Sequence, residues 1–274
     1  MGGMAGMHHA VAATATRTAL EEIDRVAKDL ADLATPGAAA GAGYHPALGW
    51  IPTMGVHWVD SDRMIKLVQT DRLNPSQLMF SRIAGKDSLV GAAYAYYTSS
   101  HDSAPPTLFD GRPAWHDHPD LAPPGMNLVM LHVWFVPSPD GPFAGTNPNL
   151  PFWALGLAVP DAHRMHDPAF SMRVRRAALA LAEVADTTSI FPNLESQPRV
   201  RPVLAARRDS IRAIIPLFRA ADRTKNHEQW DGAAARAAAQ WDAIYAAYLA
   251  SARTPTVRQQ LERYVSMLLG QHHE

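Results

Sequence analysis

The 274-residue chain contains no cysteine. This absence excludes a disulfide framework, a thiolate metal site and a cysteine nucleophile. It leaves the redox compartment open, because proteins without disulfides occur on both sides of a membrane. A chain of this length buries about three quarters of its unfolded surface, so it needs no cross-links for stability.

An excess of charge of one sign is also lacking, since 25 Lys and Arg stand against 26 Asp and Glu, a net charge of -1. This balance predicts neither nucleic acid nor an anionic membrane as a partner. No apolar run approaches the roughly 20 residues of a membrane-spanning helix. The first residues lack the basic and then apolar pattern of a signal peptide. We therefore expect a soluble, cytoplasmic protein.

The familiar catalytic motifs are missing as well. The sequence has no G-x-S-x-G elbow, no P-loop, no G-x-G-x-x-G fingerprint and no HExxH helix. The sequence therefore carries no motif that names a reaction, and any chemistry must come from other residues.

What the sequence does contain is a set of histidines placed next to aromatic residues. Met54–Trp58 (MGVHW) and Leu131–Trp134 (LHVW) each set one histidine beside a tryptophan, and Trp115–His118 (WHDH) lies between them. An imidazole in an apolar run must satisfy both ring nitrogens or bind something, because an unpaired buried polar group is costly. These three segments are therefore the best lead to a site.

If the first and last segments are neighbours in one sheet, His57 and His132 converge on a common interior, and His118 or His116 adds a third imidazole. Three histidines with an open position suit Zn²⁺, and they also suit Fe, Cu or Ni, which the sequence does not distinguish. We expect five neighbouring side chains to form the pocket wall: Met54, Trp58, Tyr94, Met130 and Trp134. In the alternative interpretation the histidines are structural, hydrogen-bonded to a carbonyl or a tyrosine, and bind nothing.

The middle of the chain predicts an antiparallel sheet. Residues 77–81, 88–98 and 127–136 have the pattern of strands, and only Gly85–Asp87 separates the first two, which favours a hairpin. The third is apolar on both faces, which indicates a central strand covered on both sides. The long connection at 102–124 predicts that His116 and His118 lie in a loop.

Helices are predicted on both sides of this core. An amphipathic pattern over 18–34 begins with a capping box at Thr18 and Glu21, and the small residues 37–43 indicate a linker. Alanine-rich helical segments follow from about residue 167. The prediction is an α+β protein with an N-terminal helix and linker (1–43), a compact, largely antiparallel β core carrying the histidines (44–155) and a helical region packed on it (156–274).

Two features of the helical region leave alternatives open. Several arginines lie close together in residues 199–223. They form either a solvent-exposed face whose charge is balanced by acidic residues, or a surface for a phosphate-bearing or acidic partner. Aromatic residues recur at helical spacing over 230–248. They form a packing face, against neighbouring helices or against a second subunit in a homo-oligomer such as a dimer.

Five motifs in order carry a resemblance: IPTMGVHW at 51–58, LVG at 89–91 with Tyr94, TLF at 107–109, LHVWF at 131–135 and GPFAGTNP at 141–148. They resemble a family of bacterial proteins of unestablished function with the patterns M-G-x-H-[YW], L-V-G-x-E-Y, L-F-G, L-H-x-W and G-x-F-A-x-x-N-P. The resemblance covers about residues 44–152 and implies one folded unit with both histidine segments. Where that family has glutamate before the tyrosine, this chain has Ala93. If the acid completes a metal shell or acts as a base, the resemblance implies a changed or absent activity here.

Two classes of function follow from these patterns. The first is a mononuclear metal-dependent enzyme that acts on a small molecule through the histidine-lined site. The second is a metal-free protein for small-ligand binding or assembly, with structural histidines.

Overall fold

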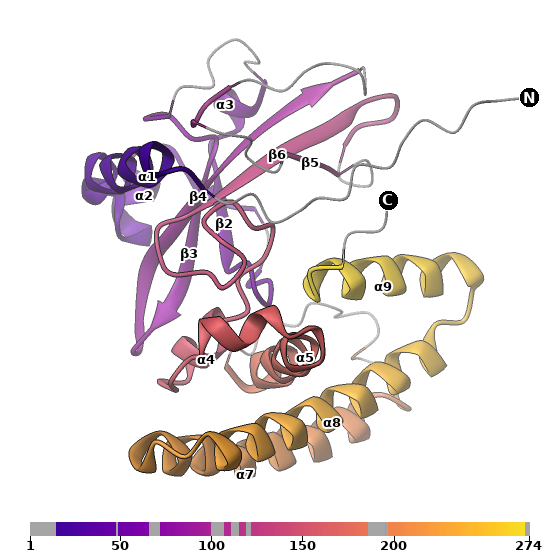
Figure 1. Cartoon of the computed structure of the whole chain (residues 1–274). Helices are drawn as coiled ribbons and strands as arrows, with labels where there is room; N and C mark the ends of the chain where they lie inside the picture. Colours follow the sequence, from indigo (N-terminus) through magenta and orange to yellow (C-terminus); the bar gives the residue numbers. More distant parts are fainter. Residues whose placement is uncertain are drawn as a thin grey trace, which may run out of the picture.

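The computed structural model describes residues 15–47, 49–65, 72–99, 107–110, 115–118, 122–185, 195 and 197–271. These residues form an α+β fold with an N-terminal helix, a sheet and a C-terminal group of helices, as predicted (Figure 1). The helices are α1 (Arg17–Asp29), α2 (Pro36–Gly41), α3 (Ser61–Ile65), α4 (Leu150–Ala154), α5 (Pro168–Ala185), α7 (Arg201–Thr224), α8 (His227–Ser251) and α9 (Pro255–Leu268).

The described strands form one six-stranded sheet in which every neighbouring pair is antiparallel. In spatial order they are β1 (His45–Pro46), β2 (Val56–Val59), β3 (Gln77–Ile83), β4 (Lys86–Thr98), β6 (Asn127–Trp134) and β5 (His116–Asp117). The predicted hairpin joins β3 to β4. Its turn residues Ala84 and Gly85 have φ of 50° and 82°, which suits the right-handed twist of the two strands. All residues of β6 are buried, in agreement with a central strand covered on both sides.

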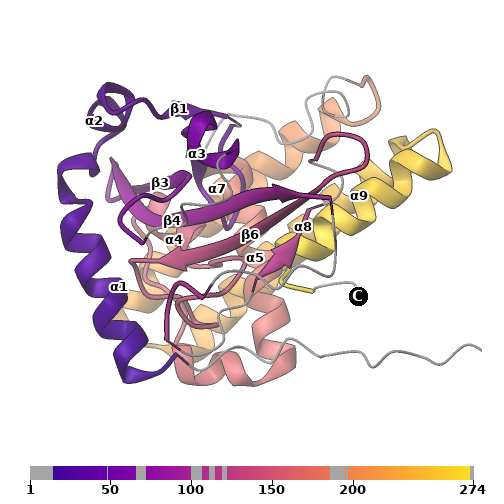
Figure 2. The same cartoon turned by 90° about the horizontal axis from the view of Figure 1, so that it is seen from above.

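Helix α1 covers one face of the sheet (Figure 2). The prediction of a helix over 18–34 is correct in type but differs at the ends. The N-cap is Thr16 rather than Thr18, because the Thr16 hydroxyl accepts a hydrogen bond from the Ala19 amide at 3.1 Å. After α1 the chain continues as a short 3₁₀ turn, Ala31–Leu33.

The predicted linker at 37–43 is wrong in part, because most of it belongs to α2. Thr35 caps this helix by accepting from the Ala38 amide at 3.2 Å, and Pro36 occupies the first turn. A cap, a proline with a preset φ and a run of alanines together favour a helix over a linker. The glycines outweigh them only at the end, where the helix stops at Gly41.

The opposite face of the sheet is covered in part by α4, which joins two apolar cores. Leu150 and Trp153 pack with the sheet, whereas Phe152 belongs to the core formed by α5, α7, α8 and α9. The C-terminal helices reach back to the sheet at its second strand. There Thr53, in the turn before β2, donates a hydrogen bond to the Leu268 carbonyl at 3.5 Å.

The aromatic stripe of the helical region packs within the chain. Trp230 on α8 lies 5.4 Å from Phe218 of α7 and stacks on Phe152 of α4 at 5.8 Å, measured between ring centroids. Two of the arginines pair with acidic residues inside the molecule, Arg208 with Glu183 and Glu195, and Arg212 with Asp209. Among the described helices, none is long and apolar enough to cross a membrane.

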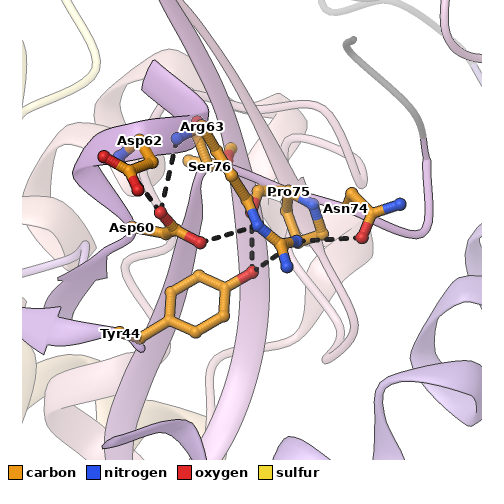
Figure 3. Close-up of polar contacts among 8 residues, drawn as sticks. Tyr44, Asp60, Asp62, Arg63, Asn74, Pro75 and Ser76 are labelled. Atoms are coloured by element: carbon orange, nitrogen blue, oxygen red, sulfur yellow. Dashed lines mark hydrogen bonds and ion pairs between the residues drawn. The ribbon is translucent and has the colours of Figure 1, made fainter. Parts of the chain in front are cut away.

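A polar network fixes the end of β2 (Figure 3). Arg63 of α3 pairs with Asp60 at 2.7 Å between Nε and Oδ2, and donates through Nη1 to Asn74 Oδ1 at 3.0 Å and to the Tyr44 hydroxyl at 3.2 Å. Tyr44 in turn donates to the Pro75 carbonyl at 2.7 Å. Because Asp60 directly follows β2, this network holds the strand that carries His57.

Candidate histidine site

The site lies on the face of the sheet opposite α1. In an antiparallel sheet, directly paired residues point to the same face. The register therefore sets out two adjacent rows across the strands. One row is His57, Met79, Gly91 and Trp134, and the other is Val59, Gln77, Ala93 and His132.

A glycine positions the first histidine. Gly55, two residues before His57, has φ of 76°, and a Cβ at this position would lie 2.4 Å from the Phe80 carbonyl oxygen. Only glycine combines this backbone conformation with so close an approach. The glycine of the MGVHW segment thus shapes the turn that leads into β2.

The two buried histidines meet across the sheet, as the sequence analysis expected. The Nε2 atoms of His57 and His132 are 3.3 Å apart, and the two ring centroids are 5.5 Å apart. The imidazoles reach each other across β3 and β4 because β4 presents only Gly91 and Ala93 on this part of the face. Sequence reasoning singled out Ala93 only through the resemblance and missed Gly91, because the role of both residues depends on the register of four strands.

His116 and His118 complete a cluster of four imidazoles. The ring of His116 lies 5.1 Å from that of His132 and 4.8 Å from that of His118, centroid to centroid. The prediction that these two residues lie in a loop is wrong for His116, which belongs to β5 and pairs with Met130 at the edge of β6. Backbone pairing also continues to His118, whose amide donates to the Leu128 carbonyl at 2.7 Å. Both side chains are half-buried, whereas His57 and His132 are buried, so the β5 side is the less enclosed side of the cluster.

Burial keeps the inner two histidines neutral. Desolvation, with a smaller contribution from His118, lowers the pKa of His57 from 6.5 to about 4. Desolvation and the neighbouring His116, His57 and His118 lower the pKa of His132 well below its usual value, and the Gly145 backbone opposes this shift. Near pH 7 both rings therefore carry one proton each and present one free lone pair, which is the form that binds metals.

The second ring nitrogen of each inner histidine is less well satisfied. The Nδ1 atoms of His57 and His132 are buried and have no hydrogen-bond partner of normal geometry among the described residues. The backbone of Gly145 is close enough to His132 to raise its pKa. A carbonyl acceptor at Nδ1 is the usual device that leaves Nε2 free as a ligand.

The described residues contain no group of three or more His, Asp or Glu side chains arranged to hold a metal ion. The arrangement is instead a close pair, His57 and His132, with two further imidazoles beside it. A third nitrogen ligand would require His116 or His118 to turn its ring toward the pair.

Two of the five expected wall residues lie on the histidine face. The ring centroid of Trp134 is 6.2 Å from that of His132, and its indole nitrogen donates to the Ala144 carbonyl at 2.6 Å. Met130 is the direct partner of His116 and is buried among the apolar residues of this face.

Trp58 and Tyr94 do not belong to the wall, because side chains alternate along a strand and these two follow His57 and Ala93 directly. Trp58 packs edge-on against Phe80 on the α1 face, with centroids 5.9 Å apart. Tyr94 packs on the same face and donates to the Arg72 carbonyl at 2.6 Å. Met54 is buried in the turn before Gly55.

Comparisons with protein-family models, with curated proteins and with solved structures gave no match to this chain. The motif resemblance therefore stays a prediction, and the site is interpreted from its own geometry.

Proposed function

We propose that this protein binds one transition-metal ion between His57 and His132 and acts on a small molecule at that ion. The observation that carries the proposal is the 3.3 Å separation of the two Nε2 atoms. Two nitrogens bound at about 2.0–2.1 Å to one tetrahedral ion are themselves about 3.3 Å apart. The same separation is also within hydrogen-bond distance for one imidazole donating to the other, which is the arrangement of the second candidate below.

The electrostatics of the pair support the same conclusion. Two imidazolium rings at this distance would repel each other in a buried site, and the lowered pKa of His57 keeps its ring neutral. Neutral imidazole is the ligand form for Zn, Fe, Cu and Ni. Metal binding would thus require no proton to leave the protein near pH 7.

The half-buried histidines give the site its access. His116 and His118 lie on the less enclosed, β5 side of the pair, where one of them would serve as the third ligand and the other would face an incoming small molecule. Trp134 and Met130 line the same face and exclude water from the inner rings. When bound, such an ion supplies a Lewis acid and lowers the pKa of a water molecule.

The second candidate is a metal-free small-ligand-binding or assembly protein in which one imidazole donates a hydrogen bond to the other. It is favoured by the lack of a third ligand in place among the described residues. The two candidates differ in a measurable way, because only the first makes metal binding depend on both inner histidines.

The test is a titration of the metal-stripped full chain with Co²⁺ and Zn²⁺. All proteins carry alanine at the terminal pairs His8, His9, His272 and His273, which would otherwise bind metal on their own. We expect one equivalent to bind, with a visible Co²⁺ spectrum of low symmetry, and both His57→Ala and His132→Ala to abolish it.

The matched control is His163→Ala, because His163 is exposed on the 3₁₀ turn η3 (Ala162–His166). It should bind like the parent. Circular dichroism checks that each variant is folded. A parent that binds no metal, or binding that survives in both folded inner variants, would reject the proposal in favour of structural histidines.

A further inference from the structure

We infer that the ion is Cu⁺ and that the thioether of Met79 is one of its ligands. The inference rests on the proposed metal site and adds the identity of the metal and of a ligand. It starts from a methionine that lies next to the histidine pair.

Met79 is the direct cross-strand partner of His57 and therefore points to the same face of the sheet. It is fully buried. Met130 stands in the same relation to His116 on the other side of the cluster. Each end of the histidine cluster thus has a methionine as its direct neighbour.

The side chain of Met79 extends across the face toward the strand that pairs with β6. A Cβ placed on Gly91 would lie 2.6 Å from Met79 Cε, so the methyl end of Met79 occupies the space above this glycine. Gly91 pairs with Trp134, two residues from His132. The thioether therefore lies on the part of the face that the two imidazoles cross.

The donor set selects a soft ion. The chain has no cysteine, so the thioethers of its 11 methionines are its only soft ligands. Thioether sulfur favours Cu⁺, and imidazole accepts it as well. Hard ions need carboxylate or several water ligands, and no Asp or Glu joins the histidines in a metal-holding group among the described residues. Cu⁺ accepts low coordination numbers, which two imidazoles and one thioether satisfy.

Met64 shows that a thioether on this face can also have a purely structural role. Its sulfur accepts a hydrogen bond from the Gln77 side-chain amide at 3.8 Å. Met79 is the methionine in register with His57 and is the proposed sulfur ligand.

The experiment measures Cu⁺ affinity without oxygen, by competition with a chromogenic Cu⁺ chelator, in the full chain with the terminal histidines replaced. Met79→Leu removes the sulfur at nearly constant volume. Met126→Leu is the matched control, because Met126 is exposed just before β6. Zn²⁺ affinity is measured on the same proteins.

We expect Met79→Leu to weaken Cu⁺ binding at least tenfold and to change Zn²⁺ affinity less than twofold, with Met126→Leu like the parent. X-ray absorption at the copper edge of the protein that keeps Met79 and carries the terminal alanines should show one sulfur and two imidazole nitrogens, which decides the matter even if Met79→Leu does not fold. Equal Cu⁺ affinity in folded Met79→Leu, or copper without a sulfur neighbour, would overturn the inference. The proposed function would then still stand if Zn²⁺ or Co²⁺ depends on His57 and His132, and would fall with it if no metal binds.

Discussion

Ala93 of β4 is the direct cross-strand partner of His132, and its methyl group lies on the face of the sheet that both buried histidines share. Gln77 of β3 is its partner on the other side. Ala93 is fully buried. One of the smallest side chains therefore lies beneath the centre of the histidine cluster, at the position where the motif resemblance predicts glutamate.

A carboxylate at this position should turn the pair into a two-histidine, one-carboxylate site. We predict that Ala93→Glu raises the affinity for Zn²⁺ or Co²⁺ at least tenfold, because a carboxylate oxygen beside His132 adds a charged ligand. Without metal the same variant should be less stable than the parent, since it buries an acid. Added metal should restore its melting temperature.

Ala92→Glu is the control for this change, because Ala92 is equally buried but faces α1. It should lose stability without gaining metal affinity. A folded Ala93→Glu protein that binds Zn²⁺ no better than the parent would show that position 93 does not reach the ion.

The neutral histidines predict acid sensitivity of the metal-free protein. Because the pKa of His57 is lowered from 6.5 to about 4 in the folded state, the unfolded chain binds the proton first as pH falls. The stabilisation contributed by the neutral His57 ring is therefore complete above about pH 6.5 and is lost as the pH falls toward 4. For His57 alone, this loss lowers the free energy of unfolding by about 3 kcal/mol. His132 shifts in the same direction, and His116 and His118 are the titratable groups that face the pair.

The measurement is urea unfolding of metal-free protein at several pH values in this range. In His57→Gln the free energy of unfolding should change less steeply with pH, since one shifted proton site is gone. An unchanged slope would show that His57 already ionises normally in the folded protein.

Two glycines should respond to alanine in opposite ways. A Cβ at Gly91 would lie 2.5 Å from the Val133 carbonyl oxygen and 2.6 Å from Met79 Cε. Gly91→Ala should therefore lower the free energy of unfolding by about 2 kcal/mol through overpacking. Gly232 is exposed within α8 and has no atom within 4 Å of such a Cβ. Gly232→Ala should stabilise the protein by about 1 kcal/mol, because alanine favours helix. Equal effects in denaturant unfolding would contradict this view of the sheet.

A buried charge cluster in the helical region provides a prediction independent of the site. Arg208 of α7 bonds Glu183 Oε2 at 2.9 Å and Glu195 Oε2 at 3.1 Å, and the Tyr248 hydroxyl donates to Glu195 Oε1 at 3.2 Å. Burial raises the pKa of Glu183, although Arg208 opposes the shift. Arg208→Met should lower the free energy of unfolding by about 3 kcal/mol, because it leaves buried acids without their partner.

Arg212 on the same helix is the comparison, since it pairs with Asp209 at 2.8 Å in an exposed i,i+3 contact. Arg212→Met should change the free energy of unfolding by less than about 0.5 kcal/mol. If thermal melting shows the two variants to be alike, the cluster does not anchor α7 to its neighbours.

The sequence predicted strands β3, β4 and β6 because alternation and apolar character are local signals. It predicted that His57 and His132 converge only if their segments are neighbours in one sheet. The two segments share one sheet but are separated by β3 and β4. The prediction that Trp58 lines the pocket with His57 is wrong, and strand alternation could have corrected it, because adjacent residues in a strand point to opposite faces of the sheet. Tyr94 follows Ala93 and is excluded by the same rule.

Other features depend on partners that are distant in the chain. His116 lies in a strand because it pairs with Met130 of β6. The two residues of β5 cannot form these hydrogen bonds by themselves, so their own sequence does not reveal the strand. The spacing of small residues on β4 matters only because β3 and β6 fall in register on either side. The short helix α2 arises from a cap and a proline that outweigh its glycines, a balance that composition alone does not decide.

The contact between Thr53 and Leu268 also determines when the site can be completed. The two residues are 215 positions apart, so the turn before His57 lacks this restraint until nearly all of the helical region has been synthesised. A nascent chain on the ribosome can form the β3–β4 hairpin early, because its contacts are local. The hydrogen bond from Thr53 can form only after α9 docks. A chain interrupted within α9 would therefore carry all four histidines without this restraint on the turn before His57.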